Sequence, residues 1–470
     1  MAFTSTSFFY FAAFFFVVFP LLGPRLRVPF VTAFSLLFYG WWDVRYVPLI
    51  LLSGAIDYLC AIRIHDSARP AARKRWMAAS VVLNLAILIY FKYANFFLDQ
   101  LSAATAVDLS IPHIILPLGI SFYTLQTLGY TIDVYRGKIA PERNFLVFTL
   151  FVSFFPQLVA GPIERARKLL PQLRAIPAFE VSFLVRGLLL VIWGLFLKLA
   201  VADNLNVYVT SAFEAERSGF LYLFICWLAM FRVYCDFAGY TLIARGLALG
   251  MRINLSENFR QPFLATTLTG FWQRWHITLT TWIVDYVHIP IARRFPQEPF
   301  RSLSAIGAMC LVGLWHGASW NFILFGLMHG VGMRLWAPVA RLFAFVPAPD
   351  GLRRVMSWIV LSVFISLSAP LFLISDLGTF WNLVSGILTD GLGWAQILAT
   401  EGRLALAFGV LAGALVFWDE VQAKRKARWT ISNIAFNGTL PQVFAATVLV
   451  IFLLVAFGER GGSDFVYFQF

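Results

Sequence analysis

The stretch LVGLWHGASWNFILFGLMHG, residues Leu311 to Gly330, carries two histidines in a run that is otherwise apolar, aromatic or small. His316 and His329 each stand directly before the second glycine of a Gly-x-x-x-Gly pattern, in the frames GLWHG and GLMHG. An ionisable ring in such surroundings serves either packing or chemistry. Which of the two applies depends first on the solvent around the segment.

Composition indicates that this solvent is lipid. The chain of 470 residues is 60% hydrophobic and 13% charged, with a mean hydropathy of +0.76, whereas soluble domains are about 45–50% apolar and about 25% charged. Apolar segments recur from Ser7 to Phe457 with no long polar linker, and a backbone inside a bilayer must satisfy its hydrogen bonds internally, as a helix does. The sequence therefore predicts an all-α polytopic membrane protein, with one membrane-embedded domain over residues 1–470.

The formal charge of +13 is distributed as in a membrane protein and not as in a protein that binds nucleic acid. Basic residues gather in short loops between apolar segments, which is typical of cytoplasmic loops. They are Arg25, Arg27, Arg63, Arg69, Arg73, Lys74, Arg75, Arg165, Arg167, Lys168, Arg174, Lys424, Arg425, Lys426 and Arg428. This pattern predicts that the N-terminus lies outside the membrane, and that the C-terminus, which follows the apolar span Pro441 to Phe457, lies outside as well.

Proline and glycine interrupt the apolar segments in the middle of the chain. They stand at Pro117, Pro156, Gly161, Pro162 and Gly270. Broken or re-entrant helices are therefore expected, and such a backbone is tolerated at membrane depth only where it is buried in protein or lines a wet cavity. We expect the core motifs of the functional site between residues 116 and 330.

The segment from Phe259 to Arg294 is highly polar for a membrane protein. It reads FRQPFLATTLTGFWQRWHITLTTWIVDYVHIPIARR, with arginines, histidines and an aspartate among aromatic rings. Ionisable side chains in a membrane face the interior of a helix bundle or water, and they indicate a site. The alternative is an amphipathic helix at the membrane surface whose basic side chains reach into the headgroups.

His316 and His329 differ in their neighbours. On one straight helix, assumed here for the apolar span Leu303 to Trp336, their spacing of thirteen residues places them about 220° apart. They then share no face, and no carboxylate lies between them, so no metal site is predicted. Close helix packing through the glycine pairs needs no chemistry, and for His329 packing and a chemical role both stay open. Beside His316, Trp315 and Asn321 suggest a polar and aromatic pocket wall, in which a neutral imidazole suits a general base.

Five stretches together resemble one protein family. They are LPLGISFYTLQTLGYTIDVYRG (116–137), FFPQLVAGPIER (154–165), YCDFAGYTLIARGLALG (234–250), NFRQPFLATTLTGFWQRWHITLTTWIVDY (258–286) and GLWHGASWNFILFGLMHG (313–330). In this order they are similar to the membrane-bound O-acyltransferase family, MBOAT. Within that family they are most similar to the branch of the alginate O-acetylation membrane subunit and the membrane protein of teichoic-acid D-alanylation.

The resemblance implies a fold and a set of site residues. The fold is a ring of transmembrane helices around a thinned core, with cytosolic and exoplasmic funnels that meet near the reacting histidine. His316 matches the histidine of the family's Trp-His-Gly motif, which is taken as catalytic, and His276 matches a second histidine in an Arg-Trp-His segment. The residues assigned to the substrate or acyl-donor pocket are Trp315, Asn321, Arg274, Asp236 and Asn258.

The implied reaction carries an acyl group, acetyl in the alginate-type branch, from a cytosolic thioester across the membrane for O-acylation of a cell-envelope polysaccharide. Acetyl-CoA is a substrate in this scheme, and no cofactor stays bound. An extracytoplasmic acyltransferase is the expected partner, and the setting is the bacterial inner membrane. The sequence lacks a Gly-x-Ser-x-Gly motif, so a serine acyl-enzyme is not expected.

Two alternatives stay open. The first is D-alanyl transfer from a carrier protein, as in the other part of the branch. The second is a transporter of a glycan or lipid, because broken helices with a polar midplane also suit alternating access. Such transporters often show internal repeats, and the sequence shows none apart from GLWHG and GLMHG, which favours the acyltransferase.

The tail, residues 458–470, ends in FVYFQF. Phe465 to Phe470 fit the spacing of a C-terminal Phe-x-Tyr-x-x-Phe motif associated with this branch, where the tyrosine is thought to take the acyl group before an outer transferase collects it. The resemblance therefore implies that Tyr467 is an acyl relay. The alternative is an anchor whose aromatic rings settle at the headgroup level.

Overall fold

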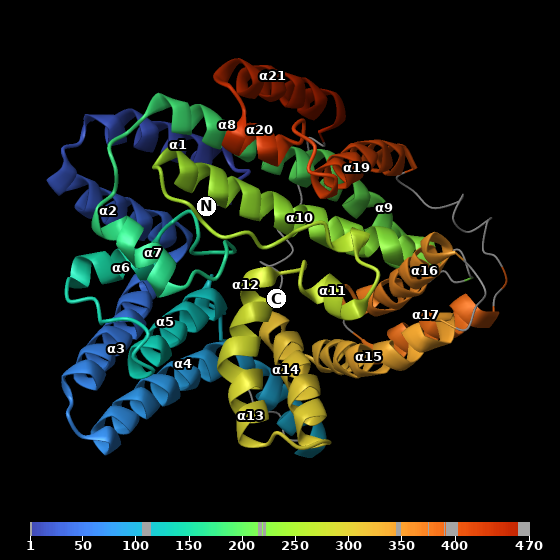
Figure 1. Ribbon diagram of the computed structural model, residues 1–470, viewed down its shortest axis with the longest axis horizontal. Coiled ribbons are helices and arrows are strands. Elements are labelled where there is room, and N and C mark those ends of the chain that lie inside the picture. Colours follow the sequence, from blue (N-terminus) through green and yellow to red (C-terminus); the bar gives the residue numbers. More distant parts are fainter. Residues whose placement is uncertain are drawn as a thin grey trace. The chain divides into compact units, whose positions relative to one another are not determined.

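The computed structural model describes residues 2–105, 114–214, 219, 222–344, 349–374, 376–389, 391 and 403–458. All regular elements in these ranges are helices (Figure 1), so the predicted all-α class is confirmed. The α-helices are α1 (Thr6–Val18), α2 (Pro24–Asp43), α3 (Val47–Asp66), α4 (Pro70–Thr105), α5 (Ile120–Tyr135), α6 (Phe145–Ser153), α7 (Ala166–Arg174), α8 (Val181–Leu195), α9 (Asp203–Glu214), α10 (Tyr222–Gly250), α11 (Leu268–Trp272), α12 (Ile277–Ile283), α13 (Ile289–Arg294), α14 (Phe300–His316), α15 (Trp320–Ala344), α16 (Asp350–Ser368), α17 (Leu377–Thr389), α19 (Arg403–Lys424), α20 (Ile431–Asn437) and α21 (Leu440–Phe457).

Eight stretches of the described residues are long and apolar enough to cross a membrane. They are Pro24–Asp66, Pro70–Thr105, Val181–Phe213, Tyr222–Gly250, Trp320–Arg341, Asp350–Phe372, Leu406–Lys424 and Leu440–Phe457. Large apolar side chains stay exposed on them, for example Phe444, Phe452 and Val455 of α21, which are 66%, 69% and 78% exposed. Apolar surface of this kind suits contact with lipid and not with water. The predicted polytopic membrane protein is therefore confirmed.

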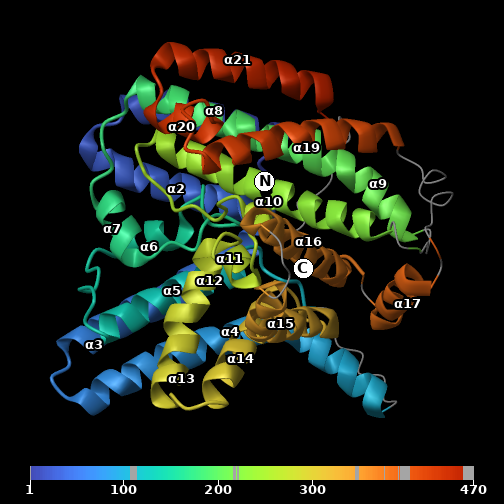
Figure 2. The same cartoon turned by 45° about the vertical axis from the view of Figure 1, so that its right-hand side comes forward.

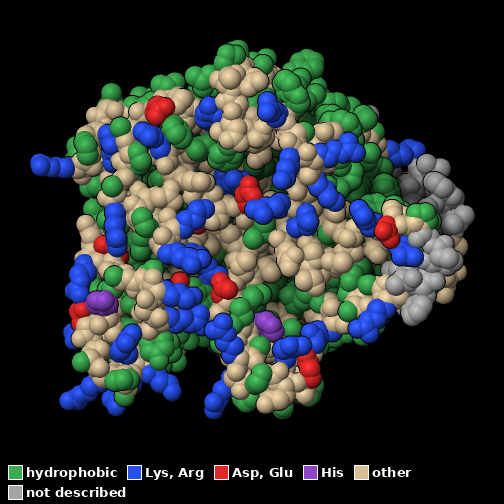
Figure 3. Space-filling model, in the orientation of Figure 1, with side chains coloured by type: hydrophobic (Ala, Val, Ile, Leu, Met, Phe, Trp, Pro, Cys, Tyr) green, Lys and Arg blue, Asp and Glu red, His purple; other side chains and the backbone are tan. Residues whose placement is uncertain are grey.

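Basic side chains are spread over the face shown in Figure 3, among many apolar ones. This follows from a composition of 37 Lys and Arg against 24 Asp and Glu. The predicted basic loop at residues 63–75 consists of the end of α3, a short turn and the start of α4. Its location in the cytoplasm stays a prediction.

The chain divides into two compact units. Unit 1 consists of Met1–Leu188 and Ile243–Ser256, and unit 2 of Leu189–Leu242 and Glu257–Phe470. Two of the three divisions fall inside α8 and α10, and the third follows α10, between Ser256 and Glu257.

In unit 1 the predicted interruption after α6 is confirmed. Residues 154–164 follow the end of α6 without forming a helix, and every one of them is buried. A Cβ on Gly161 would lie 2.5 Å from the Cα of Gln157, so the tight turn here requires glycine. Phe155, in the same segment, packs its ring against Phe11 and Phe15 of α1 at centroid distances of 5.5 and 5.2 Å. This irregular backbone is thus covered by protein, as a membrane setting demands.

A buried carboxylate ties together α3, α4 and α5, which lie side by side in unit 1 (Figures 1 and 2). Asp57 of α3 is fully buried. It accepts hydrogen bonds from Ser80 Oγ, from Asn84 Nδ2 at 3.0 Å and from Thr131 Oγ1 at 3.1 Å. Asn84 Oδ1 in turn accepts from Ser53 Oγ at 2.6 Å. The cluster therefore satisfies polar groups on three helices at once.

Replacing Asp57 is expected to destabilise the protein. Asp57→Leu leaves the hydroxyls of Ser80 and Thr131 and one N–H of Asn84 buried without their acceptor, and each such group costs about 1–3 kcal/mol. Asp57→Asn keeps one acceptor oxygen and should lose much less. Thermal unfolding in detergent, followed for both variants beside the parent, measures the difference. Equal losses in the two variants would contradict an acceptor role for the carboxylate.

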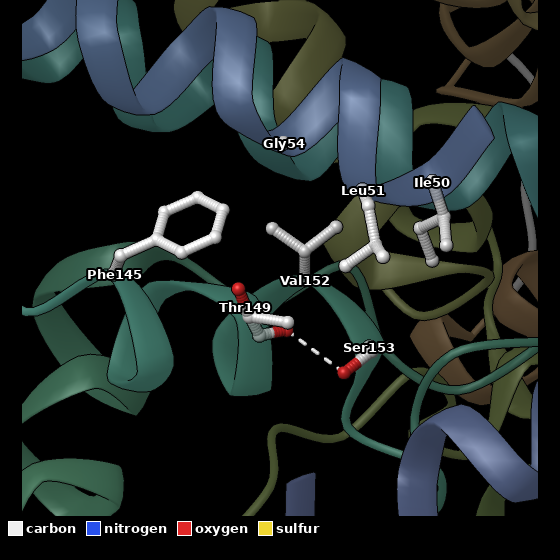
Figure 4. Close-up of a pocket in the computed structure, with 7 residues that line it drawn as sticks. All are labelled: Ile50, Leu51, Gly54, Phe145, Thr149, Val152 and Ser153. Atoms are coloured by element: carbon white, nitrogen blue, oxygen red, sulfur yellow. Dashed lines mark hydrogen bonds between the residues drawn. The ribbon is translucent and has the colours of Figure 1, made fainter. Parts of the chain in front are cut away.

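Unit 1 also contains a small cavity between α3 and α6 (Figure 4). Its lining residues are Ile50, Leu51, Gly54, Phe145, Thr149, Val152 and Ser153. The cavity volume is about 10 Å³, which is room for about one water molecule. Ser153 Oγ donates to the carbonyl of Thr149 at 2.8 Å, so its hydroxyl proton is already used. This cavity is too small for an acyl donor.

In unit 2 a π-helical segment, Phe196–Ala202, joins α8 to α9. It places Lys198 between two carboxylates, 2.9 Å from Asp203 Oδ1 and 2.7 Å from Asp236 Oδ1 of α10. All three side chains are buried. A Cβ on Gly239 of α10 would lie 2.6 Å from the carbonyl oxygen of Gly194, so close contact of the two helices relies on that glycine.

The single helix predicted for residues 303–336 is wrong. α14 ends at His316 and α15 begins at Trp320, because Gly317 adopts an extended conformation with φ −162° and ψ 157°. The ring of Phe322 covers this glycine, and a Cβ there would meet the ring at 2.1 Å. The histidines at positions 316 and 329 are thus on different helices, and the angle of 220° does not apply to them.

The glycine pairs of this region do what their spacing predicts. A Cβ on Gly313 would lie 2.0 Å from the carbonyl oxygen of Phe322, and one on Gly326 would lie 2.4 Å from that of Met309. α14 and α15 therefore pack with their backbones in close contact. That predicted role of the glycines is confirmed.

The polar segment 259–294 is not one amphipathic helix. It consists of the short helices α11, α12 and α13, with a π-helical segment, Val284–His288, between the last two. His276 and Ile283 are buried, whereas Arg293 and Arg294 are exposed. Of the ionisable residues in the first part of the segment, His276 thus lies inside the protein as predicted, whereas Arg260 is exposed and Arg274 is half-buried.

Candidate active site

His316 is the last residue of α14 and is 2% exposed. The helix ends there because the next residue, Gly317, is extended and is followed by the start of α15. Rings surround the imidazole: Trp315 at a centroid distance of 5.1 Å and Phe372 at 5.0 Å. The sequence pointed to Trp315 as a wall of this site, and the structure places it there.

His276 is fully buried and has an unusual backbone. Its φ of 43° and ψ of 51° lie in the left-handed region, and it is the residue that precedes α12. A side chain in this conformation costs of order 1–3 kcal/mol and persists only where the surroundings hold it, a situation that clusters at functional sites. The sequence gave no signal for this conformation.

Asn258 and its neighbours hold the turn at His276 in place. The amide N–H of Ile277 donates to the carbonyl oxygen of Asn258 at 2.8 Å, and that of Arg260 donates to the carbonyl oxygen of Arg274 at 2.9 Å. Asn258 Oδ1 also accepts from Thr278 Oγ1 at 2.5 Å. Residues 258–260 thus run beside residues 274–278 and fix the backbone on both sides of His276.

The two histidines meet in unit 2 although they are far apart in sequence. The ring centroids of His276 and His316 are 6.2 Å apart, and Trp315 lies 5.4 Å from that of His276. Phe237 of α10 contacts His276 at 4.8 Å. Burial among aromatic rings lowers the pKa of His276 because it disfavours the charged imidazolium, and the neutral ring is the form that can accept a proton.

The other predicted pocket residues have defined places in unit 2. Asn321 is buried, and its side-chain amide donates to the carbonyl oxygen of Ile374. Asp236 is engaged in the ion pair with Lys198. Arg274 is half-buried, and its guanidinium makes no hydrogen bond or ion pair within the part of the chain that the structure describes. A role of each in binding a donor stays a prediction.

Tyr467 lies outside the described residues. His288, in the π-helical segment that precedes α13, has its Nδ1 2.9 Å from Ser304 Oγ. Neither observation bears on chemistry at the two buried histidines.

Sequence reasoning missed two neighbours of the site histidines and the ion-pair partner of Asp236. Phe237 and Phe372 contact the histidine rings but carry no signal that separates them from the many other phenylalanines. Lys198 does carry one, because a lysine within an apolar helix is rare and indicates function or a partner. Its partner Asp236 was among the predicted residues, but the pairing was not.

Comparison with known proteins identifies the family of the chain. The sequence profile of the membrane-bound O-acyltransferase family, MBOAT, matches residues 142–375. The probable alginate O-acetylase AlgI of Azotobacter vinelandii is 31% identical over 509 residues, covering 100% of both chains. The peptidoglycan O-acetyltransferase of Helicobacter pylori is 31% identical, covering 75% of this chain and 72% of its own. The teichoic acid D-alanyltransferase of Bacillus subtilis is 28% identical over 46% of this chain and 58% of its own.

This chain belongs to the MBOAT family, and it is an acyltransferase. The predicted family is thereby confirmed. The transporter alternative is excluded, because the relatives that match 100% and 75% of this chain are named as enzymes of acyl transfer.

Proposed function

We propose that this protein moves an acetyl group from cytosolic acetyl-CoA across the bacterial inner membrane for O-acetylation of a cell-envelope polysaccharide. The observation that carries the proposal is the buried pair His276 and His316, 6.2 Å apart between ring centroids, in a chain that an alginate O-acetylase matches over 100% of its length. Relatives named for alginate and for peptidoglycan O-acetylation support an envelope polymer as the acceptor.

His316 acts as the general base in this proposal. The acceptor hydroxyl passes its proton to the imidazole while its oxygen attacks the thioester carbonyl. The tetrahedral intermediate then collapses, the carbon–sulfur bond breaks, and the imidazolium returns the proton to the thiolate. The products are an ester and the free thiol of CoA. A positioned base of this kind contributes typically ~10²–10⁴-fold to the rate.

The oxyanion of the intermediate needs hydrogen-bond donors. Asn258 Nδ2 is buried and makes no hydrogen bond to any residue that the structure describes, which costs about 1–3 kcal/mol if nothing else satisfies it. A substrate oxygen as its partner removes that cost and stabilises the developing charge. Trp315 and His276 are further candidates, whereas the amide of Asn321 already donates to Ile374.

Asn258→Asp is expected to lower acyl transfer by at least ~10²-fold. The carboxylate still accepts from Thr278 but has no N–H, and it adds a negative charge near the oxyanion. Thr278→Ala is the complementary control, because it removes the hydrogen bond from Thr278 to Asn258 that Asn258→Asp keeps, and it leaves the amide donor in place. The rate of CoA thiol release measures both variants. A loss in Thr278→Ala as large as that in Asn258→Asp would show that Asn258 acts through the turn alone.

Arg274 is the proposed contact for the anionic part of the donor. Its guanidinium is half-buried and lacks a partner within the described part of the chain, and guanidinium groups bind phosphates through paired hydrogen bonds. The phosphates of CoA fit that requirement. Arg274 is two positions before His276 in the sequence, so a phosphate bound there would lie near the proposed reacting groups.

Acetyl transfer is favoured over D-alanyl transfer by the coverage of the relatives. The D-alanyltransferases of Streptococcus thermophilus and Bacillus subtilis match 46% of this chain at 27% and 28% identity. The acetylase of Azotobacter vinelandii matches all of it. The carrier-protein donor is therefore the second candidate.

The test uses the purified protein in lipid nanodiscs. Incubation with acetyl-CoA should release CoA thiol at a rate that depends on protein concentration and falls in His316→Gln. When the protein is incubated with a D-alanyl carrier protein, the D-alanyl thioester should not be consumed. Turnover of the carrier substrate alone would overturn the acetyl proposal in favour of D-alanylation.

Transfer to the polymer also requires parts beyond the described residues. We propose that Tyr467 receives the acyl group on the outer side of the membrane and that an extracytoplasmic acyltransferase collects it there. The positive-inside distribution of Lys and Arg supports this orientation, and the Phe-x-Tyr-x-x-Phe spacing of residues 465–470 supports the relay.

A further inference from the structure

His329 is the histidine that the proposed reaction leaves without a role. It is 0% exposed, in the middle of α15 in unit 2. Its Nδ1 accepts from the indole Nε1 of Trp272 at 3.1 Å, and its Nε2 lies 3.1 Å from Ser368 Oγ. Ser368 Oγ donates in turn to the carbonyl oxygen of Ile365 at 2.9 Å.

These contacts fix the position of the proton on the ring. An indole N–H can only donate, so Nδ1 of His329 must carry a lone pair. The ring is then neutral and its proton is on Nε2. The hydroxyl proton of Ser368 is used by the Ile365 carbonyl, so the Ser368 oxygen accepts the Nε2 proton. Both ring nitrogens are thereby engaged, and no lone pair is left for removing a proton from a substrate.

The same contacts join three helices. Trp272 ends α11, His329 belongs to α15, and Ser368 ends α16. α11 has only five residues, too few for a helix to be stable by its own hydrogen bonds. Its place therefore depends on contacts such as that between Trp272 and His329.

α11 leads directly into the left-handed turn at His276. Trp275, the residue before it, stacks on Phe271 of α11 at a centroid distance of 5.3 Å. Trp272 follows Phe271 directly and contacts its ring at a centroid distance of 5.9 Å. A shift of Trp272 would therefore move Phe271 and, through Trp275, His276. Placement errors of about 1 Å at reacting groups can cost ~10²-fold in rate.

A second contact path runs from His329 to His316. The ring of Phe325 lies 4.3 Å from that of His329 and 4.6 Å from that of Phe372. Phe372 lies 5.0 Å from His316. The ring of His329 therefore supports the surroundings of both site histidines.

We propose that His329 is a positioning residue for acyl transfer: as a neutral ring with its proton on Nε2, it holds α11 through Trp272 and so sets the place of His276 beside His316. This rests on the proposed function. His329 neither contacts the reacting atoms nor exchanges a proton during the reaction.

The test compares two replacements of His329. His329→Phe keeps a ring and removes both hydrogen bonds, whereas His329→Gln offers an oxygen to Trp272 and an N–H to Ser368. We expect kcat for acetyl-CoA turnover to fall by ~10-fold or more in His329→Phe, with KM nearly unchanged. His329→Gln should recover most of the loss. A fall of ~10²-fold or more in His329→Gln as well, in folded protein, would point to proton transfer by His329 and overturn the proposal.

Trp272→Phe supplies the partner variant. It should reproduce the loss in His329→Phe, and the double variant should lose no more than either single one, because both remove one shared contact. The pH dependence of kcat should keep the same midpoint in all of them. Additive losses, a displaced midpoint, or unchanged kcat with lowered thermal stability alone would each contradict a positioning role.

Hydrogen exchange provides a readout that does not depend on the reaction. His329→Phe should speed amide exchange in residues 268–278, with the rest of the chain close to the parent, and His329→Gln should not. If the variant shows faster exchange there but the parent protein does not turn over acetyl-CoA, the contact is established and the proposed function is refuted. Unchanged exchange in His329→Phe would refute the contact itself.

Discussion

Replacing His316 with alanine is expected to lower the rate of acyl transfer by at least ~10²-fold. The variant removes the proposed acceptor for the hydroxyl proton while the helix end at Gly317 and the packing of α14 on α15 remain. His316→Gln, which preserves more of the side-chain volume, should show a similar loss. Initial rates of CoA release and a titration of acetyl-CoA binding measure the two effects separately. Near-normal transfer in either variant would exclude His316 as the base.

His276 is the comparison residue for this experiment. His276→Asn is the suitable replacement, since asparagine tolerates the left-handed backbone better than most residues. We expect a smaller or mixed effect, because His276 combines a place beside the base with a role in holding the turn. Loss of folded protein in place of a lower rate would show that its part is structural.

Tyr467→Phe is expected to abolish acylation of the polymer while the protein stays in the membrane. The replacement keeps the aromatic ring and removes the hydroxyl that would carry the acyl group. A phenol has an unperturbed pKa of about 10, so this hydroxyl depends on a base such as His316 to lose its proton. The phenyl ester formed would be a good onward donor to an outer transferase.

Mass spectrometry of the C-terminal peptide measures the relay directly. The parent protein, incubated with acetyl-CoA, should show an acetyl adduct on the peptide that contains Tyr467, and Tyr467→Phe should show none. Phe468→Leu, beside it, is the control for a general loss of aromatic packing and should retain the adduct. Undiminished polymer acylation in Tyr467→Phe would leave the tail as a membrane anchor.

The break between α14 and α15 shows where sequence reasoning reached its limit. The spacing of Gly313, Gly317, Gly326 and Gly330 correctly predicts close helix packing. The same glycines do not reveal that the chain reverses at Gly317, because glycine is tolerated inside a transmembrane helix as readily as at its end. The ring of Phe322, which packs over Gly317, favours a helix end at this glycine over a continuous helix. That packing is a tertiary contact, which local sequence patterns do not reveal.

The pairing of His276 with His316 was equally out of reach of local patterns. It depends on the left-handed turn at His276, between α11 and α12. Residues 258–260, which belong to neither helix, hold this turn through backbone hydrogen bonds. Resemblance to a family supplied both histidines, whereas the neighbours Trp315 and Asn321 alone singled out only His316. Asp57 and Lys198 carried a readable signal, a lone ionisable residue in an apolar span, but the identity of their partners follows only from the packing of distant helices.

The π-helical segment at Lys198 has a consequence for how the chain enters the membrane. The amide N–H of Asp203 donates to the carbonyl oxygen of Lys198, five residues earlier. In a regular α-helix, side chains five residues apart point in directions about 140° apart. The π-turn instead brings this cation and anion within 2.9 Å on one span. On α10, Arg232 and Asp236 are buried one helical turn apart. A lone lysine, arginine or aspartate at the centre of a helix raises the cost of insertion by about 2.5–3.5 kcal/mol. Because each span brings its own counter-charge, we expect each to enter the membrane at a lower cost than a span with a lone charge, before the ion pair between them exists.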